Sequence, residues 1–67
     1  MQSKLYALRR ERNITQEQMA KHLGISTSTY RNKEMDRQEF KSSEMFAISR
    51  HLGLEISEIF LDRKFTQ

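Results

Sequence analysis

The chain has 67 residues with no cysteine, no proline and only two glycines. Without thiols it can form neither a disulfide framework nor a zinc finger, and it has no thiol nucleophile. Its two histidines are too few to predict a metal site. No apolar run approaches the roughly 20 residues that span a bilayer, and the first residues lack the apolar stretch of a signal peptide. We therefore expect a small intracellular protein without a metal, a cofactor or a membrane segment.

Catalytic motifs are also missing. Serine and threonine are plentiful, but none stands in a nucleophile motif, and no glycine-rich loop is present to hold a phosphate. A chain of this length buries only a thin core and has no room for a substrate lid. The sequence predicts a single domain over residues 1–67, with a core at about 4–61 and a C-terminal tail at 62–67, that is not an enzyme. No small-molecule ligand is evident.

Charge is distributed unevenly along the chain. The net charge is +3, but residues 1–41 carry nine basic and five acidic side chains, whereas residues 42–67 carry three and four. A basic half on a small domain indicates an anionic partner such as nucleic acid. A solvated basic surface explains the same charges at least as well.

Apolar residues recur at helical spacing throughout the chain, and no window alternates as a strand does. We predict five helices, at about 3–12, 16–23, 27–35, 43–52 and 56–61. Thr15 and Gln18 form the pattern of a capping box, and Ser26 is the expected cap of the third helix. Gly24 and Gly53 each follow an apolar segment, where glycine ends a helix in the left-handed conformation. The predicted fold class is therefore all-α.

The third predicted helix has few apolar residues. It begins with threonine and serine, which are weak helix formers, and continues with arginine, asparagine and lysine. Such hydrogen-bonding side chains suit a helix in the major groove of DNA, where they meet base edges. A solvated surface helix near its cap has the same composition. Tyr30 is the main apolar residue of this helix, and its position favours core packing over stacking on a base.

The spacing of these residues resembles that of the Cro and lambda-repressor-like (XRE-type) helix-turn-helix family. Ala20 and Gly24 are the most diagnostic pair, because a small residue lets two helices approach and a turn glycine sets their angle. The resemblance covers about residues 4–61 and implies a compact five-helix lambda-repressor-like DNA-binding domain, with the helix-turn-helix at the second and third helices. The matching residues are Leu8-Arg9, Ile14-Thr15-Gln16-Glu17-Gln18-Met19-Ala20, Leu23-Gly24-Ile25-Ser26, Tyr30, Glu34, Ile48, Leu52-Gly53-Leu54 and Glu58-Ile59-Phe60.

The resemblance also implies roles for individual residues. Thr27, Ser28 and Asn32 occupy the positions that face base edges, and Arg31 beside them reaches either a guanine or the backbone. Gln16 stands where an amide and a helix N-terminus hold a phosphate. Further contacts to the DNA backbone are expected from Thr15, Lys33, Arg37, Arg10 and Lys41, although solubility explains Arg10 equally well.

Two features of the resemblance concern the scaffold. Arg9 and Glu34 match the family's ion pair between the first and third helices, so we interpret them as structural. The chain departs from the family after Glu34, where Met35-Asp36 provides no glycine for a left-handed turn.

Dimerisation is expected from the size of a binding site. One helix-turn-helix reads only about four or five base pairs, and a twofold dimer presents two recognition helices about 34 Å apart. No separate oligomerisation domain is visible in the sequence. Candidate seam residues are the apolar side chains of the less basic half: Phe46, Ile59, Phe60 and Phe65. Of the adjacent pair Met45 and Phe46, one should face the core and the other solvent.

We therefore expect a sequence-specific regulator of transcription that binds double-stranded DNA. The resemblance favours a Cro-like repressor of phage or mobile-element type, which binds an inverted-repeat operator as a homodimer in the cytoplasm of a bacterial or phage-infected cell, at the nucleoid. The alternative is an antitoxin-like or adaptor module that binds another protein tightly and DNA only weakly. Base preference distinguishes the two hypotheses.

Overall fold

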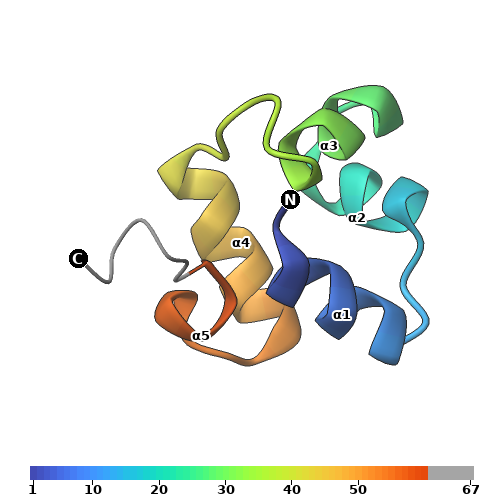
Figure 1. Ribbon diagram of the computed structural model, residues 1–67. Coiled ribbons are helices and arrows are strands. Elements are labelled where there is room, and N and C mark those ends of the chain that lie inside the picture. The colour runs from blue at the N-terminus through green and yellow to red at the C-terminus, as the bar shows by residue number, and fades with distance from the viewer. Residues whose placement is uncertain (61–67) are drawn as a thin grey trace.

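Residues 1–60 are described by the computed structural model, which contains five helices and no strand over that range. The helices are α1 (Ser3–Glu11), α2 (Gln16–Leu23), α3 (Thr27–Glu34), α4 (Ser42–Leu52) and α5 (Ile56–Phe60) (Figure 1). Their bounds agree with the predicted ones to within one residue, and the all-α fold class is confirmed. No helix in this range is long and apolar enough to cross a membrane. The predicted tail at 62–67 lies outside the described residues.

The starts of α2 and α3 are fixed by side-chain caps. The Thr15 hydroxyl accepts a hydrogen bond from the Gln18 amide N–H at 3.0 Å, and the Gln18 side chain accepts one from the Thr15 N–H at 2.9 Å. The Ser26 hydroxyl accepts from the Thr29 N–H at 3.1 Å. Both predicted caps are confirmed. They satisfy backbone donors that a helix leaves unpaired at its first turn.

Four turns among the described residues use the left-handed backbone conformation, and the first of them is at Asn13 after α1, with a φ of 58°. Gly24 ends α2 with a φ of 73° and Gly53 ends α4 with a φ of 71°, as predicted. After α3 the same conformation falls on Asp36, with a φ of 66°. Aspartate tolerates it better than most residues, and the Asp36 carboxylate accepts hydrogen bonds from the Met1 amine at 2.7 Å and the Gln2 amide at 2.9 Å. The turn after Glu34 thus forms without glycine.

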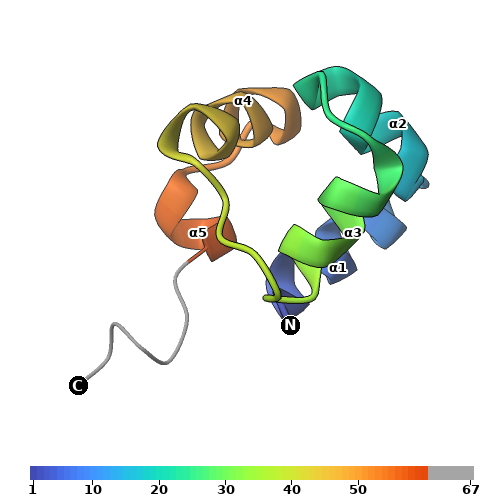
Figure 2. The same cartoon turned by 90° about the horizontal axis from the view of Figure 1, so that it is seen from above.

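The helices pack in pairs around one core. Helix α2 packs against α3 and α4, and α5 packs against α1 and α4. The rings of His22 and His51 stack with their centres 4.0 Å apart where α2 meets α4. In the view from above, the connection between α3 and α4 crosses from one side of the domain to the other (Figure 2). The buried hydrophobic side chains are Leu5, Met19, Ala20, Tyr30, Ile48, Leu52, Ile59 and Phe60.

The connection between α3 and α4 is anchored by an aromatic residue that periodicity did not reveal. Phe40 lies edge-on to Tyr30, with ring centres 5.9 Å apart, and to Phe60, at 5.3 Å. The segment 36–42 is polar apart from Phe40. One aromatic side chain in a polar stretch gives no periodic signal, so only the tertiary structure shows that it packs against the core.

Two of the residues predicted for the dimer interface, Ile59 and Phe60, are buried within the chain itself. Ile59 is 1% exposed and Phe60 is 7% exposed, because both pack into the core of the chain itself. Phe46 is 56% exposed, while its neighbour Met45 packs against the core, so the opposite orientation of this pair is confirmed. Phe65 lies outside the described residues.

Candidate nucleic-acid interface

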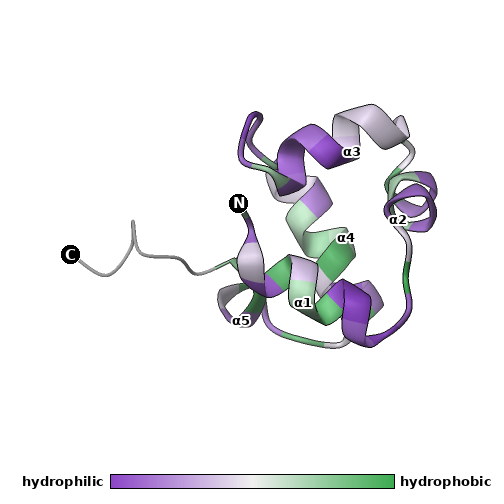
Figure 3. Cartoon of the chain, turned by 45° about the vertical axis from the view of Figure 1, so that its right-hand side comes forward, coloured by the Kyte–Doolittle hydropathy of each residue, from purple (hydrophilic) through white to green (hydrophobic). Residues whose placement is uncertain are grey.

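Helix α3 has one buried face and one exposed polar face. Its hydropathy shows no strongly apolar stretch, in contrast to α1 and α4 (Figure 3). Ser28 and Arg31 are exposed, and Thr27 and Asn32 are half-buried beside them. All four residues predicted to face base edges therefore lie where a ligand can reach at least part of them. The residues buried on the opposite face are Tyr30, Lys33 and Glu34.

A shallow surface groove of about 530 Å³ lies between the second half of α1 and the start of α2. Arg10, Thr15 and Gln16 contribute to its lining, together with Tyr6 and Asn13. Arg10 donates a hydrogen bond to the Tyr6 hydroxyl at 3.1 Å, and its guanidinium lies 5.6 Å from the centre of the Tyr6 ring. The groove brings together three residues that the sequence assigned to the DNA backbone.

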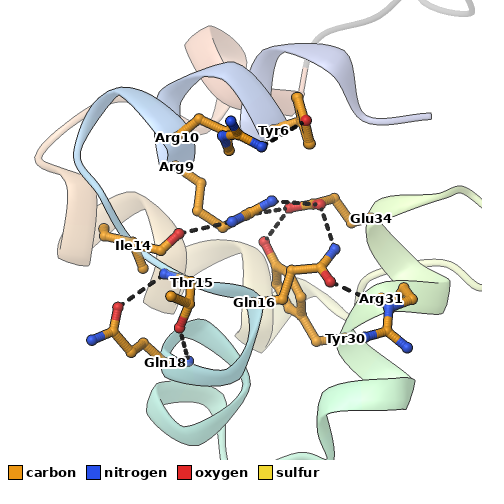
Figure 4. Close-up of polar contacts among 10 residues, drawn as sticks. All are labelled: Tyr6, Arg9, Arg10, Ile14, Thr15, Gln16, Gln18, Tyr30, Arg31 and Glu34. Atoms are coloured by element: carbon orange, nitrogen blue, oxygen red, sulfur yellow. Dashed lines mark hydrogen bonds and ion pairs between the residues drawn. The ribbon is translucent and has the colours of Figure 1, made fainter.

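A buried carboxylate holds α1, α2 and α3 together (Figure 4). Glu34 is fully buried and accepts two hydrogen bonds from Arg9, from Nε at 2.9 Å and from Nη2 at 3.1 Å. It also accepts from the Tyr30 hydroxyl at 2.8 Å and from the Gln16 amide at 2.9 Å. Arg9 Nη1 donates to the Ile14 carbonyl at 2.7 Å. The predicted Arg9–Glu34 ion pair is present, and it is the centre of a larger network.

The protonation states of this network follow from its contacts. Burial alone would raise the pKa of Glu34, but the hydrogen bonds from Arg9, Gln16 and Tyr30 outweigh burial and lower that pKa. Burial likewise opposes the charged form of Arg9, and the hydrogen bonds and charge of Glu34 outweigh it, so the pKa of Arg9 is raised. Burial and the hydrogen bond to Glu34 raise the pKa of the Tyr30 hydroxyl. At neutral pH the network is therefore a carboxylate surrounded by donors.

Gln16 connects this network to the exposed face of α3. Its amide nitrogen donates to Glu34, and its amide oxygen accepts a hydrogen bond from Arg31 Nε at 3.2 Å. Sequence reasoning assigned Gln16 and Arg31 to separate tasks. Their contact was missed because it depends on the angle between α2 and α3, which residue spacing does not give.

One of the comparisons with known proteins identifies the family of the chain. A helix-turn-helix family model matches residues 5–59, most of the chain. The chain belongs to the Cro and lambda-repressor-like (XRE-type) helix-turn-helix family. This is a family of DNA-binding regulatory domains and not of enzymes. Neither the curated proteins nor the solved structures gave a significant match.

Lys33 is buried in this helix-turn-helix domain, whereas the sequence predicted it at the DNA interface. It was expected to contact the DNA backbone, but its side chain is 5% exposed. Its ammonium donates to both Glu44 oxygens, at 2.6 and 2.8 Å. Glu44 also accepts from the Lys41 N–H at 2.8 Å, so this pair joins α3 to the start of α4. We therefore exclude Lys33 from the interface and assign it to the scaffold.

The other basic residues predicted for the backbone lie on the surface of the helix-turn-helix domain. Arg10, Arg37 and Lys41 are exposed, as is Thr15. Arg37 follows the left-handed turn after α3, where its N–H donates to the Asn32 carbonyl at 2.8 Å. That bond keeps Arg37 next to the last turn of α3.

Proposed function

We propose that this XRE-type regulator is a sequence-specific repressor of Cro-like, phage or mobile-element type. It acts as a homodimer on an inverted-repeat operator, in the bacterial cytoplasm at the nucleoid. The proposal rests on the two faces of α3, one of which is buried and the other exposed. The inner face of α3 is fixed by the buried Glu34 network, and its outer face presents exposed and half-buried polar side chains.

Base readout is assigned to the outer face of α3. Thr27 and Ser28 lie at its start, where a helix entering the major groove first meets base edges. Asn32 lies one turn further along, and an asparagine side chain pairs in a bidentate manner with adenine. Arg31 is suited to guanine. The short hydroxyls at positions 27 and 28 can form hydrogen bonds with several different bases. We therefore assign most of the base selectivity to Arg31 and Asn32.

Contacts to the DNA backbone flank this face on both sides. Thr15 and Gln16 lie at the N-terminus of α2, where backbone N–H groups and the helix dipole favour a phosphate. Arg10 extends this side from α1. Arg37 and Lys41 lie beyond the other end of α3. Such contacts fix the register of the protein on the duplex without reading its sequence.

The surface proposed for dimerisation centres on Phe46 of α4. It is the most exposed large apolar side chain among the described residues, and it belongs to the half of the chain that carries little net charge. The same ring is a suitable contact for another protein in the antitoxin-like or adaptor alternative. That alternative predicts DNA affinity without base preference, so measuring base preference separates the two.

Replacing Asn32 with alanine should relax base preference with little loss of stability. Binding is measured on the preferred duplex and on duplexes that differ from it by one base pair. We expect discrimination at one position of each half-site to fall by about tenfold, the size of one bidentate contact, while the unfolding midpoint changes little. Gln38→Ala, which removes an exposed amide from the loop after α3, is the control. An equal loss of affinity for preferred and random DNA would contradict the readout role of Asn32.

A further inference from the structure

We propose that Gln16 is a positioning residue for base readout, which orients Arg31 to read a guanine. The inference rests on the proposed function and adds to it. Sequence reasoning gave Gln16 a phosphate contact alone, which affects all DNA sequences alike. The structure adds the hydrogen bond from Arg31, and through it Gln16 acquires an effect on which base is bound.

The orientation of the Gln16 amide is fixed by its partners. An ionised carboxylate only accepts hydrogen bonds, and Glu34 is held in that form by Arg9 and Tyr30. The Gln16 nitrogen must therefore face Glu34, as it does at 2.9 Å. The amide oxygen is then directed to the surface of α3, where Arg31 Nε donates to it.

A continuous chain of hydrogen bonds thus runs from the core to the exposed face of α3 (Figure 4). It begins at buried Arg9, passes through Glu34 and Gln16, and ends at the exposed guanidinium of Arg31. Arg9, Tyr30 and Glu34 are buried, and no buried side-chain polar atom among the described residues lacks a hydrogen-bond partner. We therefore expect this part of the chain of hydrogen bonds to be rigid. A long, exposed arginine is otherwise free to adopt many rotamers, and this contact restricts it before DNA arrives.

The contact also selects which arginine atoms remain for DNA. With Nε bonded to Gln16, the two terminal nitrogens of Arg31 are left side by side in one plane. That pair matches the O6 and N7 acceptors of guanine in the major groove. Gln16 therefore favours end-on reading of guanine over a contact of Arg31 with the backbone.

The test is a double-mutant cycle measured on two duplexes. The variants are Gln16→Met, which keeps the side-chain length and removes the amide, Arg31→Ala, and the two combined. Affinity is measured for the preferred duplex and for the same duplex with the guanine pair replaced. Gln18→Met is the matched control, since its amide bonds only the Thr15 backbone among the described residues. Thermal unfolding of each variant reports whether the domain is intact.

We expect Arg31→Ala to reduce the preference for guanine by about tenfold. Gln16→Met should reduce the same preference by roughly threefold or more, in addition to a uniform loss of affinity. In the Arg31→Ala background Gln16→Met should cause only the uniform loss, because coupled residues are not additive. Gln18→Met should leave the preference unchanged. Arg31→Lys keeps the charge at an exposed site but lacks the planar N–H groups. It should reproduce the loss of guanine preference and leave the buried contacts of Glu34 with Arg9 and Tyr30 in place.

Two results would overturn the inference, and they are distinguishable. If Gln16→Met weakens binding to both duplexes equally while wild type prefers guanine, Gln16 contacts phosphate only and the proposed function stands. If the wild-type protein shows no base preference at any position, the proposed function fails and the inference fails with it.

Discussion

Replacing Glu34 with alanine is expected to lower the free energy of unfolding by about 3–5 kcal/mol, the usual effect of removing one partner from a buried ion pair. Arg9 would be left as a buried charge, and Gln16 and Tyr30 would each lose an acceptor. A domain of this size has a total unfolding free energy of only about 3–10 kcal/mol, so the substitution should remove a large share of it and shift the unfolding midpoint markedly. Urea titration followed by circular dichroism measures this.

The control for this experiment is Glu11→Ala. Glu11 is an exposed glutamate at the end of α1, and its loss should change the unfolding free energy by less than about 0.5 kcal/mol. If the two variants are equally stable, the Glu34 network does not hold the helices together. The proposal that this network fixes the inner face of α3 would then be contradicted.

The same carboxylate makes stability depend on pH in a defined direction. The pKa of Glu34 is lower in the folded protein than its ordinary value of 4.5, so its contribution is complete above that value and is lost as pH falls through the folded pKa. Unfolding midpoints measured from pH 6 to pH 2 should therefore decrease with acidification. Glu34→Gln should show a weaker decrease; a residual one is expected from Glu44, whose pKa is also lowered.

The affinity for DNA is expected to fall about a thousandfold between 50 and 200 mM salt. Arg10, Arg37 and Lys41 are exposed, so the dimer that we propose would neutralise about six phosphates and release their counterions. The logarithm of the affinity should then decrease with the logarithm of salt concentration with a slope of about −5. Fluorescence anisotropy with a labelled duplex measures the slope.

Two variants test which cations make these contacts. Arg37→Ala should reduce the magnitude of the salt slope by about two in a dimer, because each subunit loses one phosphate contact. Lys4→Ala makes the same change of charge at an exposed site at the start of α1, which the proposal assigns neither to DNA nor to the dimer surface, and should leave the slope unchanged. Equal reductions in both variants would mean that diffuse charge, and not placed contacts, attracts the DNA.

Local features of the fold were predictable from the sequence because they depend on nearby residues. Thr15 and Gln18 are three positions apart, so their reciprocal cap follows from spacing alone. Gly24 and Gly53 end helices because glycine adopts a left-handed conformation at no steric cost. The ion pair of Arg9 and Glu34 joins distant residues, and it was expected only through the family resemblance.

The features that were missed depend on how the helices pack. Lys33 was expected to contact the DNA backbone, but its side of α3 faces α4 and Glu44. Ile59 and Phe60 looked like surplus apolar surface because a sequence does not show how much of α5 the core absorbs. The bond between Gln16 and Arg31 likewise requires the angle between α2 and α3.

We propose that two copies of this chain read an inverted repeat. The most direct measurement is selection of preferred sites from a random duplex pool at about 150 mM salt, with the oligomeric state of the protein determined by sedimentation. We expect a dimer and a palindrome whose half-sites are about one helical turn apart. A pool that shows no enrichment, with affinity that fades steeply as salt rises, would contradict it and favour the adaptor alternative.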